Sequence, residues 1–210
     1  MIEKNKKPVC ITSWDDGKKS DLWLVEKLLK YKLPAIFYIP SNCELSKREI
    51  KNIAEHFEIG GHTETHQWLT RLTPKEAWFE IKDNKIWLEN LLSREITSFA
   101  PPRGYYNKQI IKLIKKAGFK ESRTVKVFNI FTPKNLFEIE TTMHITCPIR
   151  SEYNNQELEQ LSINWIDKAF EEGDYLSFWG HSEEMFRYSI EDKVERILQY
   201  LSNKMMGVDK

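Results

Sequence analysis

The fold is decided first by residues 9–17, which read VCITSWDDG. Val9 to Trp14 is rich in β-branched and aromatic residues, a composition typical of a strand. The run ends at Asp15-Asp16-Gly17, which is ordinary turn sequence. Residues 20–30 follow, with leucines and a valine at helical spacing. The stretch therefore predicts a strand that leads directly into a helix, the first half of a βαβ unit.

The same alternation continues along the chain. Further strands are predicted within residues 35–39, 57–61, 97–99, 121–125, 138–147 and 175–179. Helices are predicted at residues 46–56, 73–92, 108–117, 157–172 and 190–205, the first two opened by capping boxes. This alternation implies a parallel sheet, and about seven strands are enough to close a barrel. No linker-like stretch divides the chain, so we expect an α/β protein with a single domain over residues 1–210.

Composition excludes several classes of function. The net charge of +1 gives no electrostatic case for binding nucleic acid or an acidic membrane. We expect no membrane span, because no run of eighteen apolar residues exists. The first residues do not resemble a signal peptide, and the three cysteines are scattered, which argues for a reducing compartment and hence a cytoplasmic protein. Nothing in the sequence specifies an oligomeric state.

Four polar motifs fall at or just after predicted strand ends. They are Ser13-Trp14-Asp15-Asp16-Gly17, Gly61-His62-Thr63-Glu64-Thr65-His66, Ala100-Pro101-Pro102-Arg103-Gly104-Tyr105 and Phe178-Trp179-Gly180-His181. In barrels and open α/β sheets the carboxyl edge of the strands is where active sites form. We therefore expect these four distant segments to converge on one site.

Two of the motifs suggest a metal centre. Asp15 and Asp16 are adjacent, so on an extended strand end their side chains point to opposite sides, although Asp-Asp-Gly is also ordinary turn sequence. His62 and His66 are four residues apart, and on a helical turn they would share a face and grip one ion. They could equally be surface histidines. One Asp with two His suits zinc, and also cobalt, nickel, iron or manganese, and leaves positions open for water and substrate.

The other two motifs suggest a general acid and a rigid loop that lines the site. His181 could act as a general acid on a leaving group, or simply cap the following element. The Pro-Pro loop could present backbone N–H groups to an oxyanion, or merely end a strand. Nearby aromatic rings could stack on sugars, although packing would also explain them: Trp14, Trp68, Trp179, Tyr105 and Tyr106. His56 and His144 are interpreted as a surface helix residue and a strand residue.

Together, in this order, these motifs resemble those of the polysaccharide deacetylase family (the NodB-homology domain, carbohydrate esterase family 4) over roughly Val9 to Leu201. The resemblance implies a distorted (β/α)7-8 barrel and a divalent-metal hydrolase, with zinc the first choice, that removes N-acetyl or O-acetyl groups from a carbohydrate. By this match Asp15 would be the base and His181 the acid. Asp16, His62 and His66 would hold the metal. The predicted substrate-binding residues are Trp14, Pro102, Arg103, Gly104, Tyr105 and Trp179.

The sequence departs from the family pattern at two motifs. Ala100 occupies the slot of the arginine that normally pairs with the base, so Arg103 or Arg123 would have to supply that charge. The Asp-rich fourth motif is not identifiable between residues 126 and 150, which leaves Glu183 and Glu184 as candidates to orient His181. Two rival functions follow: a metal amidohydrolase acting on a non-sugar C–N bond, and a catalytically silent sugar-binding module.

Overall fold

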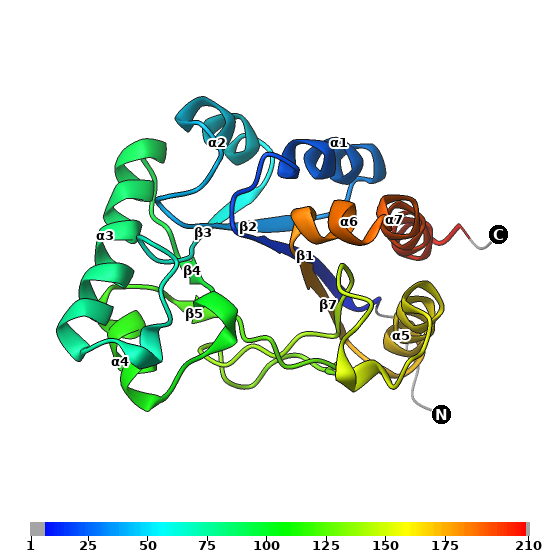
Figure 1. Ribbon diagram of the computed structural model, residues 1–210. Coiled ribbons are helices and arrows are strands. Elements are labelled where there is room, and N and C mark those ends of the chain that lie inside the picture. The colour runs from blue at the N-terminus through cyan, green and yellow to red at the C-terminus, as the bar shows by residue number, and fades with distance from the viewer. Residues whose placement is uncertain (1–6, 209–210) are drawn as a thin grey trace.

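A computed structural model describes residues 7–208, and its seven parallel strands form one curved sheet surrounded by helices (Figure 1). Their order across the sheet is β5-β4-β3-β2-β1-β7-β6. The strands are β1 (Val9–Asp15), β2 (Ala35–Ile39), β3 (Glu58–Gly61), β4 (Ser98–Phe99), β5 (Glu121–Ser122), β6 (Met143–His144) and β7 (Tyr175–Gly180). Each predicted strand region contains an observed strand, so the predicted βαβ architecture is confirmed.

Helices cover the outer side of the sheet. They are α1 (Asp21–Tyr31), α2 (Lys47–Ala54), α3 (Pro74–Leu92), α4 (Lys108–Lys116), α5 (Leu158–Glu172), α6 (Ser182–Tyr188) and α7 (Glu191–Met206), with short 3-10 turns η1 (Leu69–Arg71), η2 (Pro102–Gly104) and η3 (Ser151–Tyr153). Both predicted capping boxes form, at Ser46 and Thr73. Helix α6 was not predicted, because it follows β7 after a single residue and is only 7 residues long.

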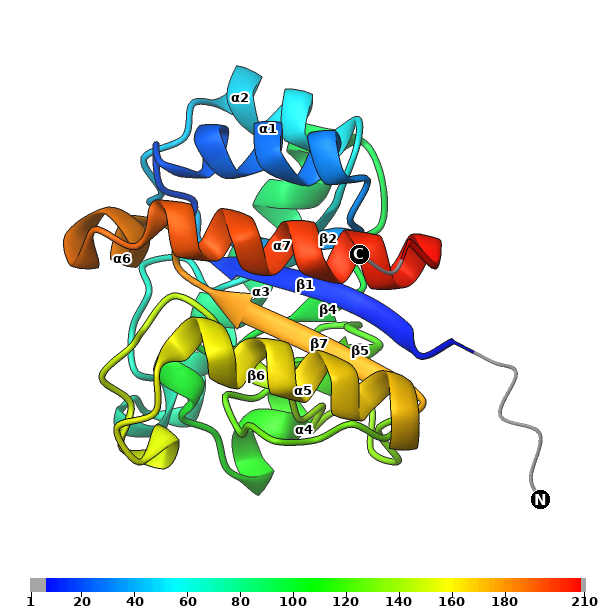
Figure 2. The same ribbon diagram turned by 90° about the vertical axis from the view of Figure 1, so that its right-hand side faces the viewer.

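Strand β1 lies at the centre of the sheet, between β2 and β7. Ser13 pairs with Ile36 on one side and Trp179 on the other. Because all pairs are parallel, every strand delivers its carboxyl end to the same edge. Figure 2 shows β1 and β7 pointing the same way, with α6 at that end. The motifs at the strand ends are therefore brought to one edge.

The sheet is closed by an irregular segment. Residues 123–142, between β5 and β6, contain no helix, and they cross the lower part of Figure 1 as loops. Arg123 forms a parallel bridge with Ile139, and the Thr124 N–H donates to the Ile139 carbonyl at 2.8 Å. A barrel that lacks one crossover helix is distorted, as the family resemblance implies, and this barrel has seven strands.

The core lies between the helices and the sheet. Its largest fully buried side chains include Trp14, Phe37, Phe99 and Phe178, one from each of four strands. Among the described residues, 7–208, none of the helices is both long and apolar enough to cross a membrane.

Candidate metal centre and active site

The three predicted metal ligands meet at the carboxyl edge of the sheet. Asp16 Oδ1 lies 3.3 Å from His62 Nε2 and 3.1 Å from His66 Nε2. Asp16 directly follows β1, and His62 directly follows β3. The His62 side chain is 1% exposed, whereas those of His66 and Asp16 are partly open, at 27% and 22%. One side of the cluster is therefore accessible to a substrate.

A shaped loop, not a helical turn, brings the two histidines together. The two histidines do not share one face of a helical turn, because Thr63 and His66 have φ angles of 72° and 60°. These left-handed residues fold the chain back, and the His66 N–H donates to the Thr63 hydroxyl at 3.0 Å. Asp16 is also left-handed, with φ 82°. Strained backbone of this kind persists only where neighbouring contacts hold it.

Two backbone contacts fix the orientation of His62. Its Nδ1 lies 2.7 Å from the Ala100 carbonyl oxygen, which can only accept, so Nδ1 carries the hydrogen. The buried Asn84 side chain accepts the His62 N–H at 2.9 Å and donates to the Ile39 carbonyl at 3.1 Å. Asn84 comes from α3, and no sequence motif singled it out. These contacts hold the ring and the backbone of His62 in place, as the hydrogen-bond partners of metal-binding residues do in metal sites.

The donor atoms fit a divalent cation. With its hydrogen on Nδ1, a neutral His62 points the Nε2 lone pair at a carboxylate oxygen. His62 Nε2 and Asp16 Oδ1 are both buried without a hydrogen-bond partner. Two facing acceptors repel unless a cation lies between them, and an Asp with two His is a common ligand set for zinc.

Asp15 forms a buried ion pair with Arg123. Arg123 Nη2 lies 2.5 Å from both carboxylate oxygens of Asp15, and the two side chains are 4% and 5% exposed. The guanidinium carbon also lies 4.8 Å from the centre of the Trp179 ring and 5.1 Å from that of Tyr38. Of the two arginines proposed to replace the missing motif arginine, Arg123 therefore contacts the carboxylate. Arg103 is exposed and lies over the Trp68 ring at 5.1 Å.

His181 is the last of the predicted catalytic and metal-binding residues at this edge of the sheet. Its Nε2 lies 4.0 Å from Asp15 Oδ2 and 3.9 Å from Asp16 Oδ2, and its Nδ1 lies 3.1 Å from Glu184 Oε2. Burial works to lower the pKa of His181, but the carboxylates of Glu184, Asp15 and Asp16 raise it to about 9. Of the two acidic candidates near it, Glu184 makes the contact. Glu183 instead pairs with Lys18 and Arg187 at the surface.

Two of the predicted substrate-binding residues, Trp14 and Trp179, are buried in this structure. Trp14 is 0% exposed and belongs to the hydrophobic core. Trp179 is 4% exposed and stacks on His144, with ring centres 3.9 Å apart. Neither ring is open to a sugar. His144, which was interpreted as an ordinary strand residue, therefore lies beside the site.

The predicted Pro-Pro loop lies at the rim. Pro102 is buried, whereas Tyr105 is 50% exposed and packs on Trp68 with ring centres 4.8 Å apart. Gly104 has φ 71°, and a side chain there would collide with Val125. The Gly104 and Tyr105 N–H groups donate to the Pro101 and Pro102 carbonyls, and these two bonds close the turn.

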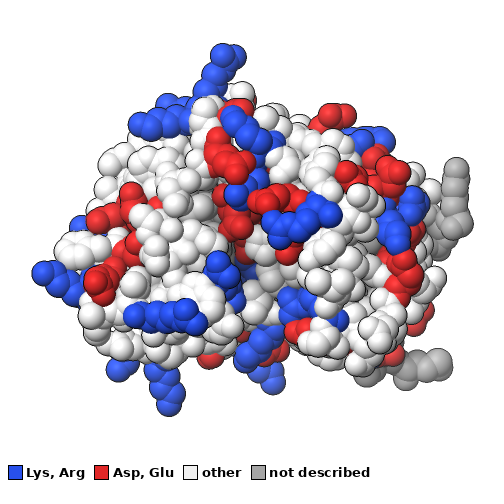
Figure 3. Space-filling model, viewed as in Figure 1, with Lys and Arg blue, Asp and Glu red and all other residues white. Residues whose placement is uncertain are grey.

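Figure 3 shows a hollow near the centre of this face, bordered by both acidic and basic side chains. A pocket of about 180 Å³ opens directly beside the candidate metal ligands Asp16 and His66. It is also lined by Lys18, Pro40, Asn42, Cys43 and Glu44. The candidate ligands can therefore be reached from the surface.

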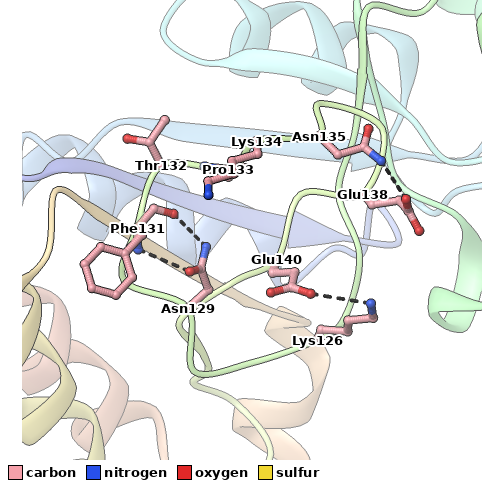
Figure 4. Close-up of a pocket in the computed structure, with 9 residues that line it drawn as sticks. All are labelled: Lys126, Asn129, Phe131, Thr132, Pro133, Lys134, Asn135, Glu138 and Glu140. Carbon is pink, nitrogen blue, oxygen red and sulfur yellow. Dashed lines mark hydrogen bonds and ion pairs between the residues drawn. The ribbon is translucent and has the colours of Figure 1, made fainter.

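A second pocket, of about 350 Å³, lies within residues 126–140 (Figure 4). Its polar side chains pair with one another: Lys126 contacts Glu140 at 3.4 Å, and Asn135 donates to Glu138 at 2.6 Å. The Thr132 N–H bonds to Asp174, just before β7, which places this pocket toward the amino ends of the strands. It is separate from the candidate active site.

Comparison with known proteins identifies the family. The polysaccharide deacetylase family model matches residues 2–122. A putative polysaccharide deacetylase of Bacillus subtilis is 29% identical over 136 residues, which cover 60% of this chain and 49% of that protein. A peptidoglycan-N-acetylglucosamine deacetylase of Bacillus cereus is 30% identical over 125 residues, covering 56% of each. The chain thus spans about half the length of these relatives.

Solved structures agree on the fold. A family 4 carbohydrate esterase from Streptomyces lividans, in complex with acetate, superposes with a TM-score of 0.66 at 13% identity, covering 96% of this chain and 88% of that one. A family 4 pseudoenzyme from Bacillus anthracis superposes with a TM-score of 0.63 at 16% identity, covering 95% and 62%. With more than half of its residues matched by the family model and the same barrel, the chain belongs to the polysaccharide deacetylase family, the NodB-homology fold of carbohydrate esterase family 4.

Proposed function

We propose that this chain is a metal-dependent hydrolase that removes acetyl groups, N-acetyl above all, from a sugar or oligosaccharide. One observation carries the proposal. Beside the Asp16–His62–His66 cluster, on the open edge of the barrel, His181 lies 3.9 Å from Asp16 and 4.0 Å from the buried, paired carboxylate of Asp15. This arrangement supplies ligands, a base and an acid for attack of water on an acyl group.

The metal would be held by Asp16, His62 and His66, and zinc suits this donor set. When bound, such an ion lowers the pKa of a water molecule and polarises the acyl carbonyl. The protein residues carry the proton transfers. Asp15 takes a proton from water as the water oxygen attacks the acetyl carbon, and Arg123 holds the carboxylate in place.

His181 acts on the leaving group. Its Nε2 faces the same space as the Asp15 and Asp16 carboxylates. As the C–N bond breaks, His181 gives a proton to the leaving nitrogen, so that the products are acetate and an amine. The Arg103 N–H is the proposed backbone donor to the acyl oxygen.

The proposed substrate-binding surface is formed by the loop at the rim of the site. Pro102, Arg103, Gly104 and Tyr105 form a turn whose Tyr105 ring packs on Trp68, and Tyr105 is half exposed. A ring pair of this kind can stack on the apolar face of a sugar. The assignment to a carbohydrate is supported by the family and by the Bacillus cereus relative, which is a peptidoglycan-N-acetylglucosamine deacetylase.

The test is acetate release from N-acetylglucosamine oligomers and O-acetylated sugars, with metal-loaded and chelator-treated protein side by side. We expect release that stops on chelation and returns with zinc, and Asp15→Asn protein as the control should release almost none. Activity that persists in the chelated protein or in Asp15→Asn would contradict the mechanism.

A silent sugar-binding module is the second candidate, favoured by Ala100 in the arginine slot and by the pseudoenzyme that shares the fold. Sugar binding without acetate release from metal-loaded protein would support it. Release of acetate from non-sugar acetamides, but from no sugar, would support the amidohydrolase interpretation.

A further inference from the structure

A second cluster of titratable side chains lies directly behind His181. Three donors converge on one oxygen, Oε2 of Glu184: His144 Nε2 at 2.8 Å, the Thr146 hydroxyl at 2.7 Å and His181 Nδ1 at 3.1 Å. Glu184 lies in the first turn of α6, whereas His144 and Thr146 lie in and just after β6. None of these groups except His181 has a part in the proposed reaction.

The contacts determine where the hydrogens are. Arg150 Nη1 lies 3.2 Å from His144 Nδ1, and because arginine only donates, Nδ1 must accept. His144 therefore carries its hydrogen on Nε2 and donates it to Glu184. Burial lowers the pKa of His144 to about 4, although Glu184 acts in the opposite direction, so this imidazole is neutral at ordinary pH.

Glu184 is consequently an ionised carboxylate that hydrogen bonds hold in one position. Burial works to raise its pKa, but His144 and His181 hold the pKa below its usual range. The Thr146 hydroxyl donates to Glu184 and accepts the His181 N–H at 3.0 Å, so it ties the backbone of His181 to the same carboxylate. The Thr146 hydroxyl can lie this close to the backbone only because residue 180 is a glycine. A Cβ at Gly180 would lie 2.5 Å from Thr146 Oγ1.

We infer that Glu184 is the positioning residue of the acid His181, replacing from α6 the carboxylate that the missing fourth motif would supply, with His144 and Thr146 holding Glu184 in place. Glu184 keeps a hydrogen on His181 Nδ1, so that Nε2 is the nitrogen that faces Asp15 and Asp16. The 3.1 Å contact between His181 Nδ1 and Glu184 Oε2 has ion-pair distance without the alignment of a full hydrogen bond.

The same three side chains could also be read as a second metal site, since their donor atoms lie within 4.8 Å of one another. Two contacts argue against this reading. The Arg150 guanidinium beside His144 adds positive charge next to any bound cation. The Thr146 hydroxyl and the His144 N–H already donate to the Glu184 oxygen that would face the ion.

The test compares Glu184→Gln with the neighbouring Glu183→Gln, using two substrates whose leaving groups differ. The inference rests on the proposed function, in which His181 protonates the leaving nitrogen. A sugar amide needs that proton, whereas 4-nitrophenyl acetate expels a stable phenolate without it. On the amide we expect Glu184→Gln to lower kcat by about 10- to 100-fold with KM nearly unchanged. On the aryl ester the loss should stay below about threefold.

Three further readouts make the outcome decisive. Zinc content of Glu184→Gln should equal that of wild type, Glu184→Asp should recover part of the amide activity, and Glu183→Gln should behave as wild type on both substrates. An equal loss on both substrates, or an unchanged amide kcat, overturns the inference while leaving the proposed function intact. Wild-type protein that carries zinc but hydrolyses neither substrate overturns the proposed function, and the inference with it.

Discussion

Arg123 Nη2 lies 2.5 Å from both carboxylate oxygens of Asp15, and this ion pair is almost entirely buried. The arginine comes from just after β5, whereas the motif position that normally supplies it, at the end of β4, holds Ala100. The Ala100 carbonyl instead accepts from His62 Nδ1. The charge partner of the proposed base has thus moved to the neighbouring strand.

Removing that partner should affect both activity and stability. Arg123→Gln leaves Asp15 as a buried carboxylate without a positive partner, which typically costs about 3–5 kcal/mol. We expect a lower urea midpoint and a fall in kcat on the N-acetyl sugar. Arg103→Gln is the matched control, because Arg103 is exposed on the rim; it should change KM more than kcat. Equal effects of the two substitutions would show that Arg123 has no special role.

Metal binding and base function should separate in two single variants. Asp15→Asn removes the proposed base but no candidate ligand, so it should keep its zinc and lose about 10²- to 10⁴-fold in kcat. His62→Ala removes a buried ligand and should lose both zinc and turnover. Metal analysis of the purified proteins, alongside acetate release, checks this. Zinc that remains at wild-type level in His62→Ala would contradict the ligand set.

Asn84 should prove important although it touches no substrate. It is 0% exposed and accepts the His62 N–H while donating to the Ile39 carbonyl. Asn84→Ala removes both of these buried hydrogen bonds, at a cost of about 1–3 kcal/mol each in the free energy of unfolding. Zinc affinity should also fall, by about 10- to 100-fold, because the loop that carries His62 loses its support.

Urea unfolding and zinc titration measure the two effects. Asn90→Ala, an exposed position on the same helix, is the control and should change neither. A loss of stability in Asn84→Ala with unchanged zinc affinity would mean that Asn84 supports the fold but not the ligand.

Stability should depend on pH through Asp21. This fully buried residue accepts a hydrogen bond from Ser182 at 2.5 Å, and burial raises its pKa from 3.8 to about 7. An acid whose pKa is raised by folding stabilises the protein fully below the unfolded pKa, and this contribution is lost as pH rises through the folded pKa. Wild-type stability should therefore decline between pH 4 and 7 by up to about 4 kcal/mol from this group alone, at about 1.4 kcal/mol per pKa unit.

Asp21→Asn isolates that contribution, because an amide oxygen can still accept from Ser182 but cannot ionise. The difference in unfolding free energy between Asp21→Asn and wild type, measured in urea at several pH values, should grow in favour of the variant from pH 4 to 7. Asp192→Asn, at an exposed position, provides the control series. A difference that stays flat with pH would show that burial does not perturb Asp21.

Local pattern was enough for much of this protein. Alternating strand and helix patterns predicted seven parallel strands, because these patterns reflect burial over a few neighbouring residues. Capping boxes at Ser46 and Thr73 form as expected, since both partners lie within one turn. The convergence of Asp15, Asp16, His62, His66 and His181 also followed from the sequence, because parallel strands deliver their carboxyl ends to one edge.

What the sequence left open depends on contacts between distant segments. Arg123, and not Arg103, pairs with Asp15, although Arg123 is 108 residues away from it in sequence. This pairing depends on how the irregular segment closes the barrel. His144 and Asn84 showed no signal, because each acts through a neighbour that only the folded chain supplies. The burial of Trp14 and Trp179 followed from which side of the sheet each ring occupies. Thus short-range pattern determined the elements and their shared edge, whereas long-range packing decided which side chains share a proton, a charge or a ligand there.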